Sequence, residues 1–195
     1  REGKTGYIEV VDSTKTGSVG IGKLEPAVVP IPDKGTEEVN GLRIQAAEIA
    51  GEYKLTALQP VLQKIVAAKW VDYKVRAAAA GALMHIAPDK NTALIGKLFN
   101  DRTELPALRQ KMAAALAQEP SATAYVILQE GLAGSSFSVQ AAIISGLSAS
   151  PDGINHILNA FKEKQFNPAV LAEPMVRERL AANSTPAQQK QLDLL

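Results

Sequence analysis

Few side chains in this sequence could take part in catalysis or bind a metal. The chain has no cysteine, which excludes a thiol nucleophile, a zinc–thiolate site, a Cys-ligated iron–sulfur cluster and a disulfide framework. Its two histidines, His85 and His156, each have an aspartate four positions away, Asp89 and Asp152. One histidine and one aspartate are too few for a tetrahedral metal site. We therefore expect both histidines to pack in the core or against turns.

Other catalytic and binding motifs are missing as well. The sequence has no glycine-rich phosphate loop behind a strand, no Gly-x-Ser-x-Gly elbow and no acidic run with calcium-loop spacing. It therefore predicts neither an enzyme nor a cofactor site. The net charge is +1, and from residue 41 onward 16 Lys or Arg stand against 13 Asp or Glu, which is too small an excess for a nucleic-acid groove. No apolar run reaches the roughly 18 residues of a transmembrane helix.

Four similar strings, each followed by a helix breaker, indicate which secondary-structure elements the chain forms. Each string starts with an aliphatic residue and then Arg or Gln, and carries small or apolar residues three, four and seven positions later. The strings are LRIQAAEIA (42–50), VRAAAAGAL (75–83), LRQKMAAAL (108–116) and VQAAIISGL (139–147). Their second residues are 33, 33 and 31 positions apart. Prolines recur at similar intervals, at Pro60, Pro88, Pro120, Pro151 and Pro186.

Because proline is tolerated in the first turn of a helix, this pattern predicts a helix–turn–helix unit of about 32 residues. Ser121, Asp152 and Thr185 are the expected N-caps of second helices.

The aliphatic-Arg-x-x-Ala-Ala-x-x-Leu string at this period resembles HEAT repeats, in particular their short bacterial, phycobilisome-lyase-like variety. The resemblance covers about residues 39–195 and is strongest in the first three copies. It implies an all-α fold: a right-handed α–α superhelix, or armadillo-type solenoid, of four to five helix pairs. A fifth copy is interrupted by Pro174, so we expect its first helix to be kinked or to start late.

Residues 1–38 differ from this domain, since they hold six of the 14 glycines and three prolines. We predict an extended or β-hairpin segment and linker there, with short strands at 7–11 and 19–21, and a helical repeat domain at 39–195. The chain starts at Arg1 and ends in an apolar stretch, so we expect a piece of a longer multidomain protein. The absence of cysteine fits a cytoplasm and a bacterial periplasm equally, but the resemblance favours a periplasmic or secreted, bacterial protein.

The resemblance also implies roles for the recurring arginines. Arg43, Arg76 and Arg109 are expected to form a structural ladder in which each meets an acid or carbonyl groups in a turn between units. Asp72 and Asp101 are the candidate acids. The alternative is that the arginines bind a ligand. The alanines at 77–80 leave room for neighbouring helices to approach closely.

Several residues are candidates for binding a partner. Second helices form the concave face in this family, and the polar positions predicted there, mostly uncharged, are Gln59, Gln63, Lys97, Gln129, Asn155 and Asn159. Trp70 and Tyr73 lie between two units, where Trp70 is either a buried staple or an exposed recognition residue. Residues 131–161 carry one formal charge and include Phe137 at a unit boundary. This helix pair is either buried between its neighbours or a neutral contact patch.

Taken together, these patterns predict a non-catalytic interaction scaffold. It is expected to bind a protein, or a neighbouring domain of the same chain, through its concave or charge-poor face, with no membrane and no cofactor. The alternative is a nucleic-acid-binding or base-repair solenoid, which the small net charge disfavours.

Overall fold

The computed structural model describes residues 35–194 and folds them mostly into helices. Ten α-helices and two 3₁₀ helices follow one another: α1 (Gly35–Glu52), η1 (Thr56–Leu58), α2 (Gln59–Ala67), α3 (Tyr73–Ile86), α4 (Pro88–Asn100), α5 (Pro106–Gln118), α6 (Ala122–Glu130), α7 (Phe137–Leu147), α8 (Pro151–Lys162), η2 (Pro168–Ala172), α9 (Pro174–Asn183) and α10 (Pro186–Leu192). No strand occurs between residues 35 and 194. The predicted all-α class is confirmed for this part of the chain.

The predicted β segment and its two strands lie outside the described residues. Only its last four residues, 35–38, can be compared, and they belong to α1 rather than to a linker. Glu37 and Glu38 stand in the first turn of this helix, where carboxylates interact favourably with the helix dipole. The helical domain therefore begins about one turn earlier than the predicted boundary.

Polar side chains and prolines set the helix starts. Ser121 and Thr185 accept hydrogen bonds from backbone N–H groups at the starts of α6 and α10, as predicted. The cap of α8 is Ser150, not Asp152, which is the second residue of the helix. Pro174 is the first residue of α9. It therefore starts this helix and does not kink it, because its missing N–H would be unpaired there in any case.

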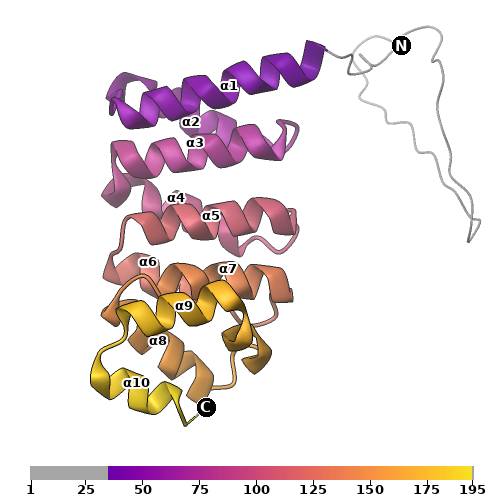
Figure 1. The fold of residues 1–195 in the computed structure, drawn as a ribbon. Helices are drawn as coiled ribbons and strands as arrows, with labels where there is room; N and C mark the ends of the chain where they lie inside the picture. Colours follow the sequence, from indigo (N-terminus) through magenta and orange to yellow (C-terminus); the bar gives the residue numbers. More distant parts are fainter. Residues whose placement is uncertain (1–34, 195) are drawn as a thin grey trace, which may run out of the picture. The chain divides into compact units, whose positions relative to one another are not determined.

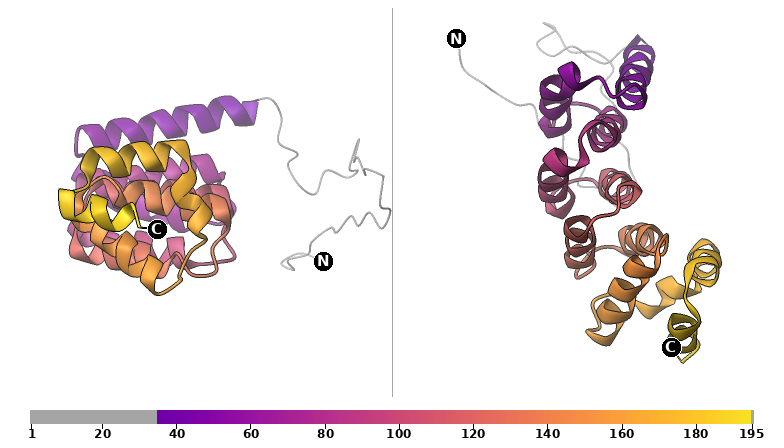
Figure 2. Two further views of the ribbon diagram at one scale, coloured as in Figure 1. Left: turned by 60° about the horizontal axis from the view of Figure 1, so that its bottom comes forward. Right: turned by 90° about the vertical axis from the view of Figure 1, so that its left-hand side faces the viewer.

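The helices are arranged in two layers (Figures 1 and 2). In one layer α3 packs against α5 and α5 against α7, and in the other α4 packs against α6 and α6 against α8. Each helix of the first layer also contacts its successor in the second, as in the pairs α3–α4, α5–α6 and α7–α8. At the far end η2 and α9 pack on α7, and α10 packs on α8. None of the helices in residues 35–194 is long and apolar enough to span a membrane.

Small residues allow the first-layer helices to lie close together. Ala79 and Ala80 of α3 are completely buried. A Cβ at Gly51 of α1 would lie only 2.9 Å from the Cα of Ala82 in α3, and a Cβ at Gly146 of α7 would lie 2.7 Å from the Cβ of Ala117 in α5. Both distances are too short for a side chain. The contacts α1–α3 and α5–α7 therefore depend on residues with little or no side chain.

Burial explains why helix α7 carries no charged residue. Helix α7 is enclosed by α5, α8, η2 and α9, and no residue from Val139 to Leu147 is exposed. Only its first two residues, Phe137 and Ser138, are open to solvent, and Phe137 is 41% exposed. Burial therefore holds for α7, and we drop the neutral contact patch there except for Phe137 itself. Helix α8 is buried on one side and exposes Asp152, Asn155 and Asn159 on the other.

Replacing Ala79 by leucine should destabilise the domain. Three extra carbon atoms have no space at a position with no exposed surface, so we expect Ala79→Leu to lower the free energy of unfolding by about 1–3 kcal/mol. The matched control is Ala114→Leu, on the exposed side of α5, which should stay within about 0.5 kcal/mol of the parent. Urea denaturation followed by circular dichroism measures both. Equal stability of the two variants would contradict the close packing of α3.

Candidate functional site: the inter-pair turns and their arginine ladder

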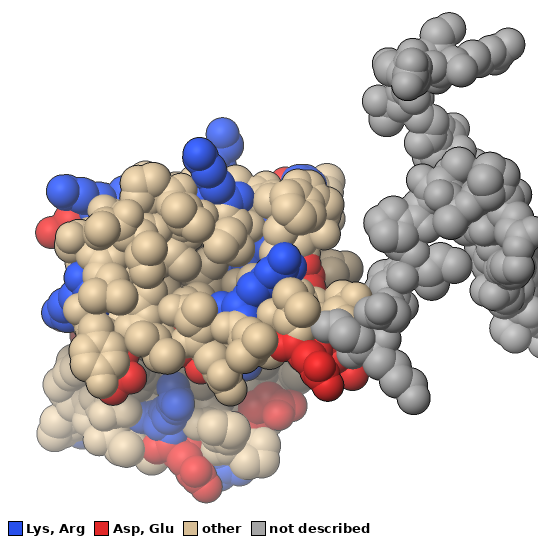
Figure 3. All heavy atoms as spheres, turned by 90° about the horizontal axis from the view of Figure 1, so that it is seen from above, with Lys and Arg blue, Asp and Glu red and all other residues tan. Residues whose placement is uncertain are grey.

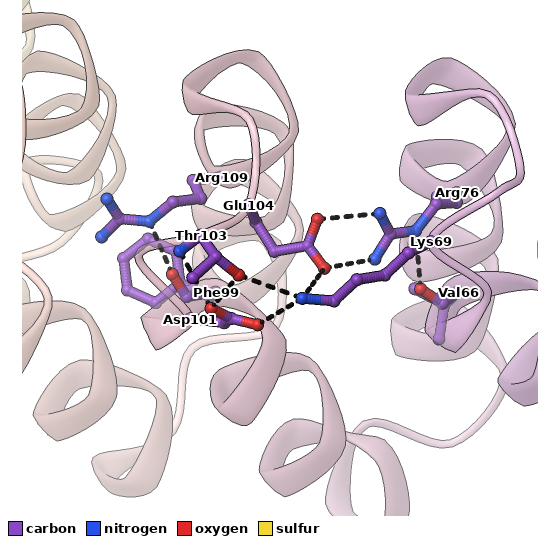
Figure 4. A network of polar contacts seen from close by, with 8 residues as sticks. All are labelled: Val66, Lys69, Arg76, Phe99, Asp101, Thr103, Glu104 and Arg109. Atoms are coloured by element: carbon purple, nitrogen blue, oxygen red, sulfur yellow. Dashed lines mark hydrogen bonds and ion pairs between the residues drawn. The ribbon is translucent and has the colours of Figure 1, made fainter. Parts of the chain in front are cut away.

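Arg76 is buried and ties together three elements. Its side chain is 4% exposed. Its Nε donates a hydrogen bond to the carbonyl oxygen of Val66, near the end of α2, at 2.9 Å. Its Nη1 and Nη2 donate to the two carboxylate oxygens of Glu104, just before α5, at 2.8 and 2.7 Å (Figure 4). One guanidinium group thus links α2, α3 and the turn that leads into α5.

Arg109 holds the corresponding place in α5. Its Nε donates to the carbonyl oxygen of Phe99, near the end of α4, at 2.7 Å, and its Nη2 donates to Ser135 Oγ at 2.8 Å. The guanidinium carbon also lies 5.5 Å from the centre of the Phe99 ring, a cation–π distance. Burial, and secondarily the charge of Arg102, lower the pKa of Arg109. This rung therefore contains a charge without a carboxylate against it.

Gln140 continues the series in α7 without a charge. Its Nε2 donates to the carbonyl oxygen of Leu132 at 3.1 Å, and its Oε1 accepts from the backbone N–H of Asn167 at 3.1 Å. Arg76, Arg109 and Gln140 thus repeat one pattern. Each satisfies a carbonyl group in or just after the preceding second helix, and each reaches forward to the next turn.

The expectation for Arg43 was wrong. This side chain is exposed, and the hydrogen bond that it makes within residues 35–194 is to Asn40 of its own helix, at 3.4 Å. A rung needs the last carbonyl groups of a preceding second helix, and α1 is the first helix of the described residues. Arg43 therefore has the right position in the sequence repeat, but among residues 35–194 there is no helix end for it to bind.

The acids proposed as partners were also wrong. Asp72 accepts from the N–H of Lys74 at 2.8 Å and caps α3. Asp101 accepts from the N–H and hydroxyl of Thr103, at 2.9 and 2.6 Å, and from Lys69 Nζ at 3.0 Å. The bonds from Thr103, followed by Lys69, hold the pKa of Asp101 well below its usual range. Both aspartates thus organise their own turns.

Glu104, the acid that Arg76 does bind, was missed. Its side chain is 5% exposed, and Lys69 Nζ lies 3.9 Å from its Oε1. The hydrogen bonds from Arg76 lower its pKa below the ordinary value of 4.5, although burial alone would raise it. The available signal was its distance of 28 residues from Arg76, which is close to the repeat length. Asp101 directly follows the end of α4 and is therefore the acid that the sequence favours as the partner.

The three aromatic candidates lie at the starts of first-layer helices. Trp70, in the turn before α3, is 86% exposed, so of its two interpretations the exposed residue holds and the buried staple does not. Tyr73 is half-buried at the start of α3. Phe137 opens α7, and Leu105, which was not predicted, stands before α5 with 57% exposure. We call Trp70, Tyr73, Leu105 and Phe137 the turn edge, because the turns into α3, α5 and α7 lie on one side of the stack (Figure 1).

The polar candidates of the second helices split into two groups. Three of them bind the next second-layer helix: Gln63 donates to Asn91 at 2.9 Å, Gln129 pairs with His156 Nδ1 at 2.7 Å, and Asn155 accepts from Gln188 at 2.8 Å. These three contacts hold the layer together and occupy groups that were expected to meet a partner. Lys97 and Asn159 are exposed, and Gln59 is half-buried.

The histidines have structural or solvent-exposed positions. His156 packs its ring 5.4 Å from Tyr125 and binds Gln129, whereas His85 is exposed on α3, contrary to its expected packing role. Within residues 35–194 no three His, Cys, Asp or Glu side chains are grouped as a metal would require.

Comparisons of the chain with protein-family models, with curated proteins and with solved structures found no match. The residues and contacts described above are therefore what a proposed function depends on.

Removing the Arg76 side chain should lower the free energy of unfolding more than a substitution on the surface does. Arg76→Ala leaves Glu104 buried without a partner and removes the bond to Val66, so we expect a loss of about 3–5 kcal/mol in the free energy of unfolding. The matched control is Arg43→Ala, the exposed copy of the same repeat position, with an expected change of about 0.5 kcal/mol or less. Similar losses in both variants would contradict the difference between the two arginines.

Stability should also depend on pH through Glu104. Its pKa in the folded chain is below the ordinary 4.5, so the unfolded chain binds more protons in the window between the two values, and stability falls as pH falls. The stabilisation is fully present above the unfolded pKa and is lost as the pH drops through the folded one.

Glu104→Gln removes this titration. The difference in unfolding free energy between wild type and Glu104→Gln should therefore be largest near neutral pH and shrink in acid. Urea titrations at a series of pH values measure it. A difference that stays constant down to acid pH would show that Glu104 has the same pKa folded and unfolded.

Proposed function

We propose that residues 35–194 form a HEAT-like, right-handed helical solenoid that acts as a non-catalytic scaffold and binds another protein through the turn edge. The two layers of helices and the ladder that recurs at about 33 residues support the solenoid part of this proposal. The single observation that carries the binding part is Trp70, which is 86% exposed on a turn whose neighbours are held in place.

The turn that bears Trp70 is fixed on both sides. Before it, Lys69 binds Asp101 and Thr103 of the next turn, each at 3.0 Å. After it, Asp72 caps α3, and the N–H of Val71 donates to the carbonyl of Ala68 at 3.0 Å. A partner that covers Trp70 would therefore not have to order the backbone first, which lowers the entropic cost of binding.

The composition of the turn edge suits a protein partner. Large apolar side chains recur in three successive turns, as Trp70, Leu105 and Phe137. Exposed charges of both signs surround them, including Lys69, Lys74 and Asp72. Apolar anchors inside a rim of mixed charge are typical of protein–protein interfaces, whereas a phosphate backbone attracts positive charge alone.

Trp70→Ala should weaken binding of a partner by about 30-fold, as expected for an aromatic hot spot worth about 2 kcal/mol. A partner captured with the full chain is purified and titrated against wild type and variant. Because Trp70 is the only tryptophan, its emission should shift to shorter wavelength when the purified partner covers it.

Val126→Ala serves as the control, since Val126 is also an exposed apolar residue but lies on α6, away from the turn edge. Partners that bind Trp70→Ala as tightly as wild type, with no change in tryptophan emission, would overturn the assignment of the turn edge. Tight, salt-sensitive binding of a labelled DNA duplex would instead support the nucleic-acid alternative.

A further inference from the structure

Helix α1 exposes a row of large apolar side chains on the side that faces away from α3. Val39, Leu42, Ile49 and Tyr53, the last just after the helix end, are 44%, 66%, 52% and 69% exposed, and the exposed Ala46 lies between them. The steps between these residues alternate between three and four. This is the spacing of the residues that meet in a pair of packed helices. We call this row the outer stripe.

The repeat shows that this side of a first-layer helix is normally covered. Adding 33 to Leu42, Ala46, Ile49 and Tyr53 gives Val75, Ala79, Ala82 and Ile86 of α3, which are 1%, 0%, 3% and 8% exposed. The close approach of Gly51 to Ala82 shows that α1 itself covers this side of α3. The outer stripe is thus the equivalent of a helix-packing surface, and in residues 35–194 no helix lies on it.

One position distinguishes the outer stripe from the helix-packing surfaces inside the stack. The residues equivalent to Ile49 are Ala82 in α3, Ala115 in α5 and Gly146 in α7, and at Gly146 a Cβ would already be 2.7 Å from Ala117. Inside the stack this position must be small. In α1 it is a large aliphatic residue, which favours interlocking with the side chains of a helix that lies further away.

The charges of α1 limit which kind of partner helix can bind to the outer stripe. Helix α1 has four glutamates and one arginine, a net charge of −3. Glu38, Gln45 and Glu52 form a row seven residues apart directly beside the outer stripe, and all three are exposed. Figure 3, which views this end of the stack, shows a broad uncharged surface with Lys and Arg as well as Asp and Glu side chains at several places around it. A partner helix would therefore place its flanking side chains against carboxylates.

We propose that the outer stripe is the docking site for a basic amphipathic helix of another polypeptide, with an aliphatic stripe flanked by Lys or Arg. A second copy of this chain fits less well, because it brings two helices of net charge −3 together. In an antiparallel pair it also sets Glu38 against Glu52 of the copy. The inference is independent of the turn edge, since Trp70 is not part of the outer stripe and either surface can bind without the other.

Synthetic peptides test both parts of the proposal on the full chain. The first is a labelled helical peptide of about 21 residues with Leu at the contact positions and Lys beside them. The second carries Glu in place of Lys, and the third carries Ser in place of Leu. Fluorescence anisotropy should give saturable binding of the Lys peptide, with the Glu and Ser peptides weaker by about tenfold or more.

Variants then locate the site. Ile49→Asp places a charge in the outer stripe and should abolish binding, whereas Val126→Asp, an equally exposed aliphatic residue on α6, should leave it unchanged. Thermal melts of both variants check that each remains folded. The double variant Glu38→Lys and Glu52→Lys should reverse the preference, so that the Glu peptide binds more tightly than the Lys peptide.

Three outcomes would overturn the proposal. The first is no binding of the Lys peptide to the full chain. The second is equal binding of the Lys and Glu peptides, or binding that survives Ile49→Asp, because then neither charge nor the stripe selects the ligand. The third is a full-chain dimer in sedimentation analysis that Ile49→Asp converts to a monomer, which would make a second copy the occupant.

Discussion

The structure of residues 35–194 depends on how the carbonyl groups at the ends of second-layer helices are satisfied. The last carbonyls of an α-helix have no partner within the helix, and a buried one left unpaired costs stability. Here Val66 and Phe99 receive hydrogen bonds from Arg76 and Arg109, which belong to the first helix of the next pair. The same bond that satisfies a helix end thereby fixes how the next pair sits on it, and its recurrence gives successive pairs similar spacing.

A hydrogen-bond donor recurs at the same position of each rung, but the group that compensates its charge differs. Arg76 has a buried carboxylate, Arg109 has an aromatic ring and a hydroxyl, and Gln140 has no charge to compensate. A buried ion pair adds little net stability over neutral groups of similar size, although breaking it is costly. The constraint on this position is therefore a donor long enough to reach the helix end. The second partner of each rung is a group of the next turn, which differs from rung to rung.

The ladder also explains why binding surfaces lie where they do. Its rungs meet in the turns between pairs, and together with the bonds of Lys69 and Asp72 they hold the turn on which Trp70 stands 86% exposed. The outer stripe on α1 arises differently, because within residues 35–194 no helix covers this side of α1. Among residues 35–194 Arg43 has no helix end to bind, and the large side chain of Ile49 replaces the small residue that stacking within the array requires. The turn edge presents single anchors, whereas the outer stripe presents a surface the length of a helix.

Local sequence determined the helices, because prolines, capping residues and the helical spacing of apolar residues act over a few neighbouring positions. The starts of α6, α9 and α10 and the small residues of α3 can be read this way. The groups that meet across turns could not be predicted from the sequence. Equivalent positions of a repeat look alike in the sequence even where their surroundings in the structure differ. Arg43 and Arg76 share a sequence position, yet one is in solvent and the other is buried against Glu104. Exposure of Trp70 and of the outer stripe likewise follows from which neighbours are present, and only the packed tertiary structure decides that.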